Sequence, residues 1–160
     1  MGAKRLEELM AFQLAREFKL AAYRIVEKST RAKGDQRWRD QVLDAAASGE
    51  ANVAEGFHRF GAAEFAHFLG IARASIGEAK VRLLDGADRG HYPAGDCRNA
   101  AVLADRAISC ITKLKMSLEP YIKRKGPGLG RERAVDVDVD VDRNVNRSQV
   151  PNRPRGRERT

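Results

Sequence analysis

Apolar residues recur with helical spacing in four separate stretches of the chain. In each stretch the apolar side chains return every three or four residues, as they do on one face of an α-helix. Aromatic residues make up only 6% of the 160 residues. A core rich in Ala and Leu and poor in aromatic residues suits packed helices better than a β-sandwich or barrel.

These stretches predict four helices joined by short connections. The first is expected from about Leu6 to Ser29 and ends at the sequence RAKGD, and the second runs from about Gln36 to Phe57. The sequence HRFGAA then turns the chain into the third helix, which ends near Gly90. Connections of about 4 to 8 residues favour antiparallel neighbours. We therefore predict an all-α fold, an antiparallel up-down-up-down four-helix bundle, over residues 1–125.

The fourth helix has its own start and stop signals. Asp96 looks like an N-cap, because its side chain can accept hydrogen bonds from the first free amides of a helix. Pro120 should stop or kink the helix near Leu118, because proline lacks the N–H that a helix interior needs. The residues expected on the core faces of the first, third and fourth helices are Leu14, Phe18, Ala21 and Ile25; Phe65, Phe68, Ala72, Ser75, Ile76, Ala79 and Leu83; and Leu103, Ala104, Ala107, Ile111, Leu114 and Leu118.

The core stripe of the second predicted helix is built from small residues. Glycine inside a helix costs about 1 kcal/mol relative to alanine, and this stripe contains Gly49 and Gly56. Close approach of another backbone is the usual reason for such a cost. The stripe consists of Val42, Ala45, Ala46, Gly49, Val53 and Gly56.

Residues 126–160 have a different, low-complexity composition, and we predict a disordered tail. The alternation of Val and Asp would suit one strand, but Asp is poor in strands and no second strand is present to pair with it. Asp136, Asp138 and Asp140 mimic the start of a calcium-binding loop. Val141 replaces the required Gly and Arg147 the required Glu, which excludes that site.

Charge and cysteine content narrow the class of protein. The formal net charge is +8, of which +6 lies in residues 1–125, and this excess favours anionic partners. Two cysteines are too few for a disulfide framework and are expected to be reduced. The start of the chain lacks the apolar core of a signal peptide, and no run of about 18 apolar residues occurs. We therefore expect a cytoplasmic protein with no cofactor and no membrane partner.

Polar residues cluster where the second predicted helix ends. Asn52, Glu55 and Arg59 are spaced three and four residues apart and so share a helix face. Glu64 occupies the last position of a capping box in which Gly61 replaces the usual Ser. The pattern is compatible with an intrachain network that fixes the turn and with a joint between subunits.

A metal site is the weaker interpretation of the same region. Glu55 and His58, and likewise Glu64 and His67, form two Glu-x-x-His motifs of the kind found in di-iron bundles. Further carboxylates would have to come from Glu7 or Glu8 and from Glu119, at an end of the bundle that should be wet. We therefore interpret the histidines as surface residues and predict no metal site. No nucleophile turn or phosphate-binding loop is present either, so no catalytic residue is predicted.

The segment ANVAEGFHRFGAAEFAHFLGIARASIGEA, residues 51–79, resembles a bacterial four-helix-bundle family named for 23S rRNA intervening-sequence proteins, also called S23-type ribosomal proteins. The likeness covers roughly residues 6–120. His58 and Ala74 stand where the family usually has Gly, Gly61 where it has Ser, and Gly49-Glu50 where it has Ile-Pro. The matching positions are Asn52, Ala54, Glu55, Gly56, Arg59, Glu64, Phe65, Phe68, Leu69, Ile71, Ala72, Ser75 and Glu78.

This resemblance implies a ring of subunits, typically a homopentamer, without enzymatic activity. It assigns the motif residues Asn52, Glu55, Gly56, Arg59, Glu64, Phe65, Ser75 and Glu78 to the fold and its assembly. By analogy with related bundles that act on RNA with a reverse transcriptase, it also suggests electrostatic binding of RNA or of an RNA-handling protein. The alternative is an assembly scaffold with no nucleic-acid role.

Candidate phosphate contacts lie at the end of the fourth predicted helix. Their alternative role is to interact favourably with the helix C-terminus, where the helix dipole is negative. In the tail, Arg153, Arg155, Arg157 and Arg159 would add nonspecific attraction. The helix candidates are Lys113, Lys115, Lys123, Arg124 and Lys125.

Overall fold

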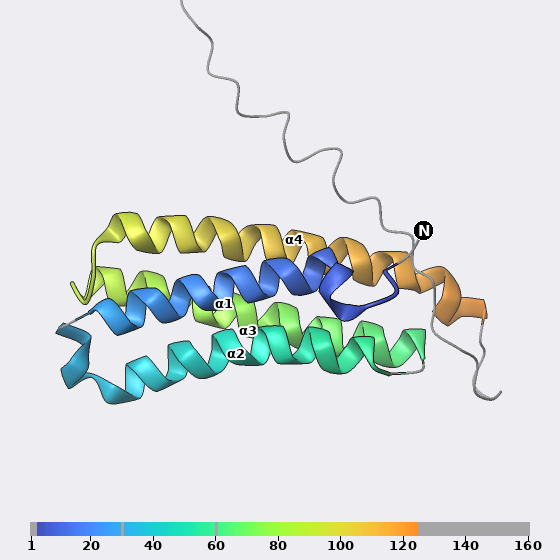
Figure 1. Cartoon of the computed structure of the whole chain (residues 1–160), viewed down its shortest axis with the longest axis horizontal. Helices are drawn as coiled ribbons and strands as arrows, with labels where there is room; N and C mark the ends of the chain where they lie inside the picture. Colours follow the sequence, from blue (N-terminus) through green and yellow to red (C-terminus); the bar gives the residue numbers. More distant parts are fainter. Residues whose placement is uncertain (1–2, 30, 60, 125–160) are drawn as a thin grey trace, which may run out of the picture.

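The computed structural model describes residues 3–29, 31–59 and 61–124, and in these ranges every regular element is helical. The α-helices are α1 (Met10–Lys28), α2 (Gln36–Phe57), α3 (Ala62–Asp88) and α4 (Ala94–Arg124), with short 3-10 turns η1 (Leu6–Glu8) and η2 (Arg31–Gly34). Each long helix runs antiparallel to the one before it (Figure 1). The predicted tail from residue 126 onward, including its calcium-loop mimic and its arginines, lies outside the described residues, as does Lys125.

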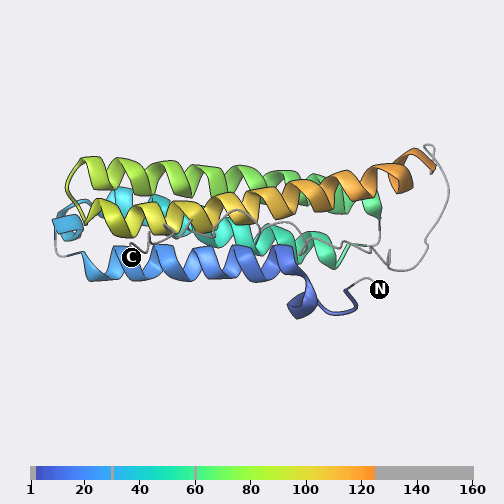
Figure 2. The ribbon, with the colours of Figure 1, turned by 90° about the horizontal axis from the view of Figure 1, so that it is seen from above.

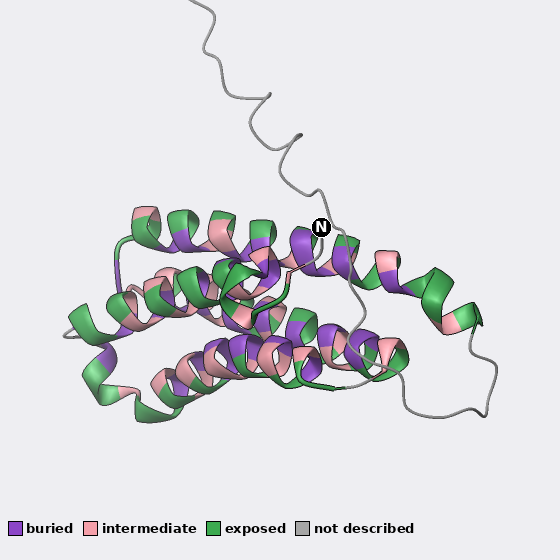
Figure 3. Cartoon of the chain, turned by 45° about the vertical axis from the view of Figure 1, so that its right-hand side comes forward, coloured by how far each residue is buried: buried purple, intermediate pink, exposed green. Residues whose placement is uncertain are grey.

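Four helices pack around one core in the order of the chain. Helix α2 packs against α3, α3 against α4, and α1 against both α2 and α4, whereas α1 and α3 lie across the bundle from each other (Figure 2). The buried residues line the inner faces of the helices (Figure 3). This arrangement confirms the predicted all-α four-helix bundle.

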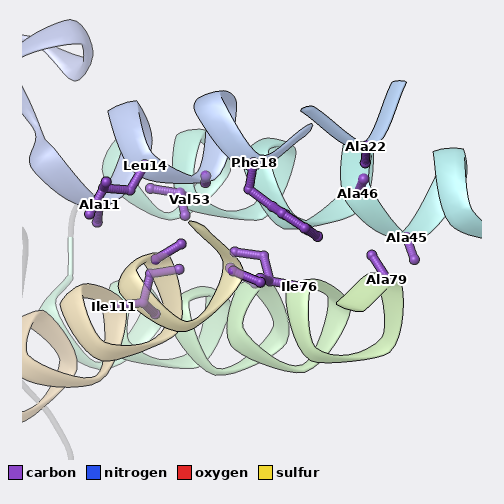
Figure 4. Close-up of a cluster of buried hydrophobic side chains, with 14 of the residues drawn as sticks. Ala11, Leu14, Phe18, Ala22, Ala45, Ala46, Val53, Ile76, Ala79 and Ile111 are labelled. Atoms are coloured by element: carbon purple, nitrogen blue, oxygen red, sulfur yellow. The ribbon is translucent and has the colours of Figure 1, made fainter. Parts of the chain in front are cut away.

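The core is filled mainly by aliphatic side chains and alanine, as the composition predicts. Phe18, Val53, Ile76 and Ile111 come from the four different helices and meet in the centre with no exposed surface (Figure 4). The predicted core stripe of α1 is partly wrong, because the buried residues continue through Ala22 and Val26 instead of Ala21 and Ile25. The true stripe advances in steps of four, close to the 3.6-residue period. Ala21 and Ile25 are only half-buried.

The small stripe of α2 is buried throughout, and the atoms that approach its two glycines belong to α3, mainly to its side chains. A Cβ added at Gly49 would lie 2.5 Å from Cγ1 of Ile76. One added at Gly56 would lie 2.8 Å from Cδ2 of Phe65 and 2.8 Å from Cβ of Phe68. Both glycines therefore allow two helices of the same chain to approach closely.

Three predicted helix ends differ from the structure. Helix α1 begins at Met10 and not at Leu6, because Leu9 adopts an extended conformation (φ −76°, ψ 113°) that separates it from η1. Helix α4 begins at Ala94, so Asp96 lies in its first turn and is not the N-cap. The helix also continues through Pro120 to Arg124. Pro120 is exposed, so water can hydrogen-bond the carbonyl group that the missing N–H leaves free.

Helix α3 ends in a Schellman motif that sets the direction of the next connection. Gly90 has φ 73°, in the left-handed region that glycine adopts without strain. The His91 N–H donates to the Gly86 carbonyl oxygen at 2.8 Å, and the Gly90 N–H donates to that of Ala87 at 2.9 Å. This ending presents His91 and Tyr92 to the space between α1 and α4.

Candidate functional site

A row of hydrogen-bonded polar residues follows the outer edge of the contact between α2 and α3. We call this row the α2–α3 seam; it consists of Gln41, Ser48, Asn52, Ser75, Glu78 and Arg82. At its centre the hydroxyl oxygens of Ser48 and Ser75 lie 3.0 Å apart. Asn52 Nδ2 donates to the Ser48 carbonyl oxygen at 2.8 Å and to its Oγ at 3.1 Å. The three residues thus fix the register of one helix along the other.

Arg82 extends the seam toward the start of α2. Its Nε and Nη2 donate to Oε1 of Glu78 at 3.0 and 2.7 Å, and its Nη1 donates to Oε1 of Gln41 at 2.5 Å. The Trp38 indole N–H donates to the Arg82 carbonyl oxygen at 3.0 Å. Because two residues of α2 bond to Arg82 of α3, this end of the seam also links the two helices.

The other predicted polar residues form two separate groups. Arg59 is ion-paired with Glu55, one turn earlier on α2. The guanidinium carbon of Arg59 lies 5.1 Å from the ring centroid of Phe68 on α3. Oε2 of Glu64 lies 3.3 Å from where a Cβ on Gly61 would stand, so Glu64 folds back over the first turn of α3. The residues expected to form one cluster therefore act at three places.

Glu50 is a buried acid that sequence reasoning did not single out as a functional or structural residue. It is 8% exposed on α2 and faces α1. Arg16 Nη1 lies 3.3 Å from its Oε1, and Lys19 is ion-paired with its Oε2. The sequence contained a signal for this contact. Glu50 directly follows Gly49 of the small stripe, so its burial could have been predicted, and a buried carboxylate requires a charged partner.

The predicted phosphate-binding residues of α4 are all exposed, but they do not form one patch. Successive helical residues are rotated by about 100°, so Lys113 and Lys115 point in different directions. Lys115 Nζ lies 3.2 Å from where a Cβ on Gly70 would stand, and therefore extends across α3. Lys123 Nζ lies 3.9 Å from Glu119 Oε2, and Arg124 ends the helix.

The charges of the bundle are divided between two sides. The neighbouring helices α1 and α4 together contain ten Lys or Arg against five Asp or Glu, a net charge of +5. The other two helices, α2 and α3, contain five against eight, a net charge of −3. The net charge of residues 1–125 alone does not show that the two pairs of helices differ in charge. We call the following exposed cations of α1 and α4, none of which is ion-paired with a described acid, the basic face: Arg24, Lys28, Arg98, Arg106 and Lys113.

Large apolar side chains are exposed on α3 and on the outer face of α4, where they lie three or four residues from cations of the basic face. Val81, Val102 and Met116 are 66%, 59% and 61% exposed. Lys80 and Asp105 form an ion pair across α3 and α4, next to Val81 and three residues from Val102. We call Val81, Val102 and Met116 the apolar edge.

The histidines and cysteines provide no gathered set of ligands. His58 and His67 are exposed, and Glu55 is already ion-paired. Within the described ranges, no three His, Cys, Asp or Glu side chains come together as metal ligands would. Cys97 and Cys110 are free and buried, and burial raises the pKa of each thiol to about 11. Both thiols are therefore protonated at neutral pH.

The folded part of the chain matches a known protein family. The family described as 23S rRNA-intervening sequence protein matches residues 7–113. The chain belongs to this family. The matched range covers α2 and α3 with the whole α2–α3 seam, and it ends at Lys113. A search of curated protein sequences found no match to the chain.

Two further findings concern the family and the length of the helices. The family is not known as an enzyme family. No helix in residues 3–29, 31–59 and 61–124 is long and apolar enough to cross a membrane.

Proposed function

We propose that this protein is a non-enzymatic bundle that self-assembles into a homo-oligomer, a pentamer by its family resemblance, and binds RNA electrostatically in the cytoplasm. The observation that carries the RNA part is the charge division between +5 on α1 and α4 and −3 on α2 and α3. A surface with unpaired cations on one side attracts a phosphate backbone and orients it.

The basic face suits contacts to phosphates more than recognition of a base sequence. Arg98, Arg106 and Lys113 are spaced by about two helical turns along α4, so they can contact a chain of phosphates at several points. Tyr121, at 41%, is the one large exposed aromatic side chain among the described residues. A surface of this kind lacks the stacking platforms of sequence-specific single-strand binders.

Self-assembly is supported by the apolar edge. Large exposed apolar side chains on α3 and α4 are compatible with an interface between subunits. Covering Val81, Val102 and Met116 with a second copy would remove their apolar surface from water. A scaffold that binds only protein is the alternative, and it is favoured by the same apolar edge.

The RNA part is tested by fluorescence anisotropy with a labelled single-stranded RNA at 50 and 200 mM salt. We expect affinity to fall about tenfold or more over this range. Arg106→Gln with Lys113→Gln should weaken binding at low salt. The matched pair Arg37→Gln with Arg73→Gln, on α2 and α3, should leave it nearly unchanged. Equal effects of the two pairs, or affinity that is flat with salt, would leave the scaffold as the function.

A further inference from the structure

A pocket of about 660 Å³ lies at one end of the basic face and has no role in the proposal so far. It is formed by the second half of α1, the connection between α3 and α4, and the first turns of α4, at the left end of the bundle in Figure 1. Its volume is in the range of small-molecule sites. Its residues come from parts of the chain about 70 positions apart, so the sequence alone does not reveal it.

The walls of the pocket are apolar and the rim is mainly cationic. Ile25 of α1 and Leu103 of α4 are half-buried side chains on opposite walls. Arg24 and Lys28 stand on the rim, one turn apart on the same face of α1. Neither is ion-paired with a described acid.

The α4 side of the pocket offers groups of different chemistry. Asp96 and Asn99 line it and are both exposed, so a carboxylate and an amide are available there. His91 also lines the pocket, and its Nε2 is buried 3.4 Å from Asp35 Oδ2. Asp96 is the one acid among the lining residues, against Arg24 and Lys28.

The pocket is held in shape by contacts that do not depend on a ligand. Ser29 Oγ donates to the His91 carbonyl oxygen at 2.5 Å and accepts from the Ala32 N–H at 3.0 Å, which ties the end of α1 to the connection. Tyr92 is 9% exposed and packs against Trp38, with ring centroids 5.3 Å apart. The rim and walls are thus positioned before anything binds, which lowers the entropic cost of binding.

We propose that this pocket binds one nucleotide, either as part of a single-stranded RNA or free. The proposal rests on the RNA binding proposed above and assigns that binding a specific site. Arg24 and Lys28 would contact the phosphate, as cationic side chains do. The base would lie between Ile25 and Leu103, with its edge at Asn99 and Asp96, an amide and a carboxylate that can pair with the polar atoms of a base.

Trp38 provides a direct measurement, because it is the single tryptophan of the chain and contacts two lining residues. Uridine monophosphate is titrated into the full chain with excitation at 295 nm, and the other three monophosphates are followed by calorimetry. We expect saturable binding. Arg24→Gln with Lys28→Gln should weaken it at least tenfold, and Asn99→Ala should weaken it and change the preference among bases.

The matched control is Arg106→Gln with Lys113→Gln, which removes the same charge from the same face outside the pocket. It should leave monophosphate binding unchanged. If a short single-stranded RNA competes with the monophosphate, the strand and the free nucleotide share the site. If only the RNA binds, and the pocket variant weakens it more than the control does, the site takes a nucleotide within a strand.

Two results would overturn the proposal. In the first, the pocket variant and the control variant bind the monophosphates with equal affinity and also bind the RNA with equal affinity. If both variants still bind RNA, the proposed function stands without the pocket. In the second, the peptide AVDVDVDVD, residues 134–142 of the chain, binds the pocket while nucleotides do not. That result would assign the pocket to an acidic segment of the protein itself.

Discussion

At the scale of single residues, two helical glycines allow the effect of packing on stability to be distinguished from the effect of helix propensity. Gly49→Ala would place a Cβ 2.5 Å from Ile76, while the same change at Gly77 meets no atom within 4 Å. We expect Gly49→Ala to lower the free energy of unfolding by about 1–3 kcal/mol, because overpacking exceeds the gain in helix propensity. Gly77→Ala should raise it by up to about 1 kcal/mol. Urea unfolding measures both, and a stabilised Gly49→Ala variant would refute the close contact.

Glu50 is the second residue whose substitution has a defined cost. Glu50→Ala would leave Lys19, which is half-buried, without its partner. We expect a loss of about 1–2 kcal/mol in the free energy of unfolding, less than for a fully buried pair because Arg16 is exposed. Glu17→Ala on α1, an exposed acid that forms no ion pair with a described cation, is the control and should change stability by less than about 0.5 kcal/mol. If Glu50→Ala and Glu17→Ala lower the free energy of unfolding equally, the ion pair of Glu50 and Lys19 contributes nothing to stability.

The buried thiols predict how stability depends on pH. Burial raises the pKa of Cys97 and Cys110 to about 11, above the value of 9 for an unperturbed thiol. Between these values the unfolded chain loses thiol protons that the folded chain keeps, so stability should fall as pH rises from about 9 to 11. Urea unfolding at pH 8 and pH 10.5 should show a smaller loss in the Cys97→Ala/Cys110→Ala variant than in the natural sequence. The same loss in both would exclude the thiols as its cause.

At the scale of elements, the α2–α3 seam is a link between helices that a double-mutant cycle can measure. Ser48→Ala and Ser75→Ala each remove one hydroxyl of a pair 3.0 Å apart. We expect a coupling energy of about 0.5–1.5 kcal/mol in urea unfolding. The control is a second cycle that combines Ser48→Ala with Ser109→Ala. The hydroxyls of Ser48 and Ser109 are not paired with each other, so the effects of these two substitutions should be additive. Additivity in the first cycle would show that the seam does not couple the helices.

Helix α2 illustrates how much of an element can be predicted from sequence. Its predicted ends, Gln36 and Phe57, match the structure because Asp35 accepts a hydrogen bond from the Trp38 amide at the start and HRFGAA breaks the pattern at the end. Helix α4 was predicted less well. Asp96 is of a residue type that favours the N-cap, but it lies in the first turn of the helix. Proline usually ends a helix, but Pro120 is exposed and the helix continues through it. Side-chain type predicts a helix, but its ends depend on neighbours distant in sequence.

The candidate sites were less predictable than the elements. The family motif located Asn52, Ser75 and Glu78. Their partners Ser48 and Arg82, and the contact of Arg82 with Gln41, required the packing of α3 on α2. The pocket beside Arg24 and the two-sided charge division arise only when α1 and α4 become neighbours.

At the scale of the whole molecule, the apolar edge predicts where copies meet. Val102→Glu with Met116→Glu would place two charges in an interface and should reduce the mass of the assembly in light scattering. The fold should be kept, because both side chains are exposed in the bundle, and circular dichroism checks this. Ala63→Glu, an exposed site in the first turn of α3, is the control and should leave the mass unchanged. An unchanged mass in the double variant would move the interface elsewhere.

We propose that this 23S rRNA-intervening sequence protein assembles and carries RNA. The most direct test is light scattering after size exclusion of the full chain, purified without nuclease and monitored at 260 and 280 nm. We expect a mass near five times that of the 17.7 kDa chain, with excess absorbance at 260 nm that is removed by high salt. A monomer with a pure protein spectrum at both salt concentrations would contradict it.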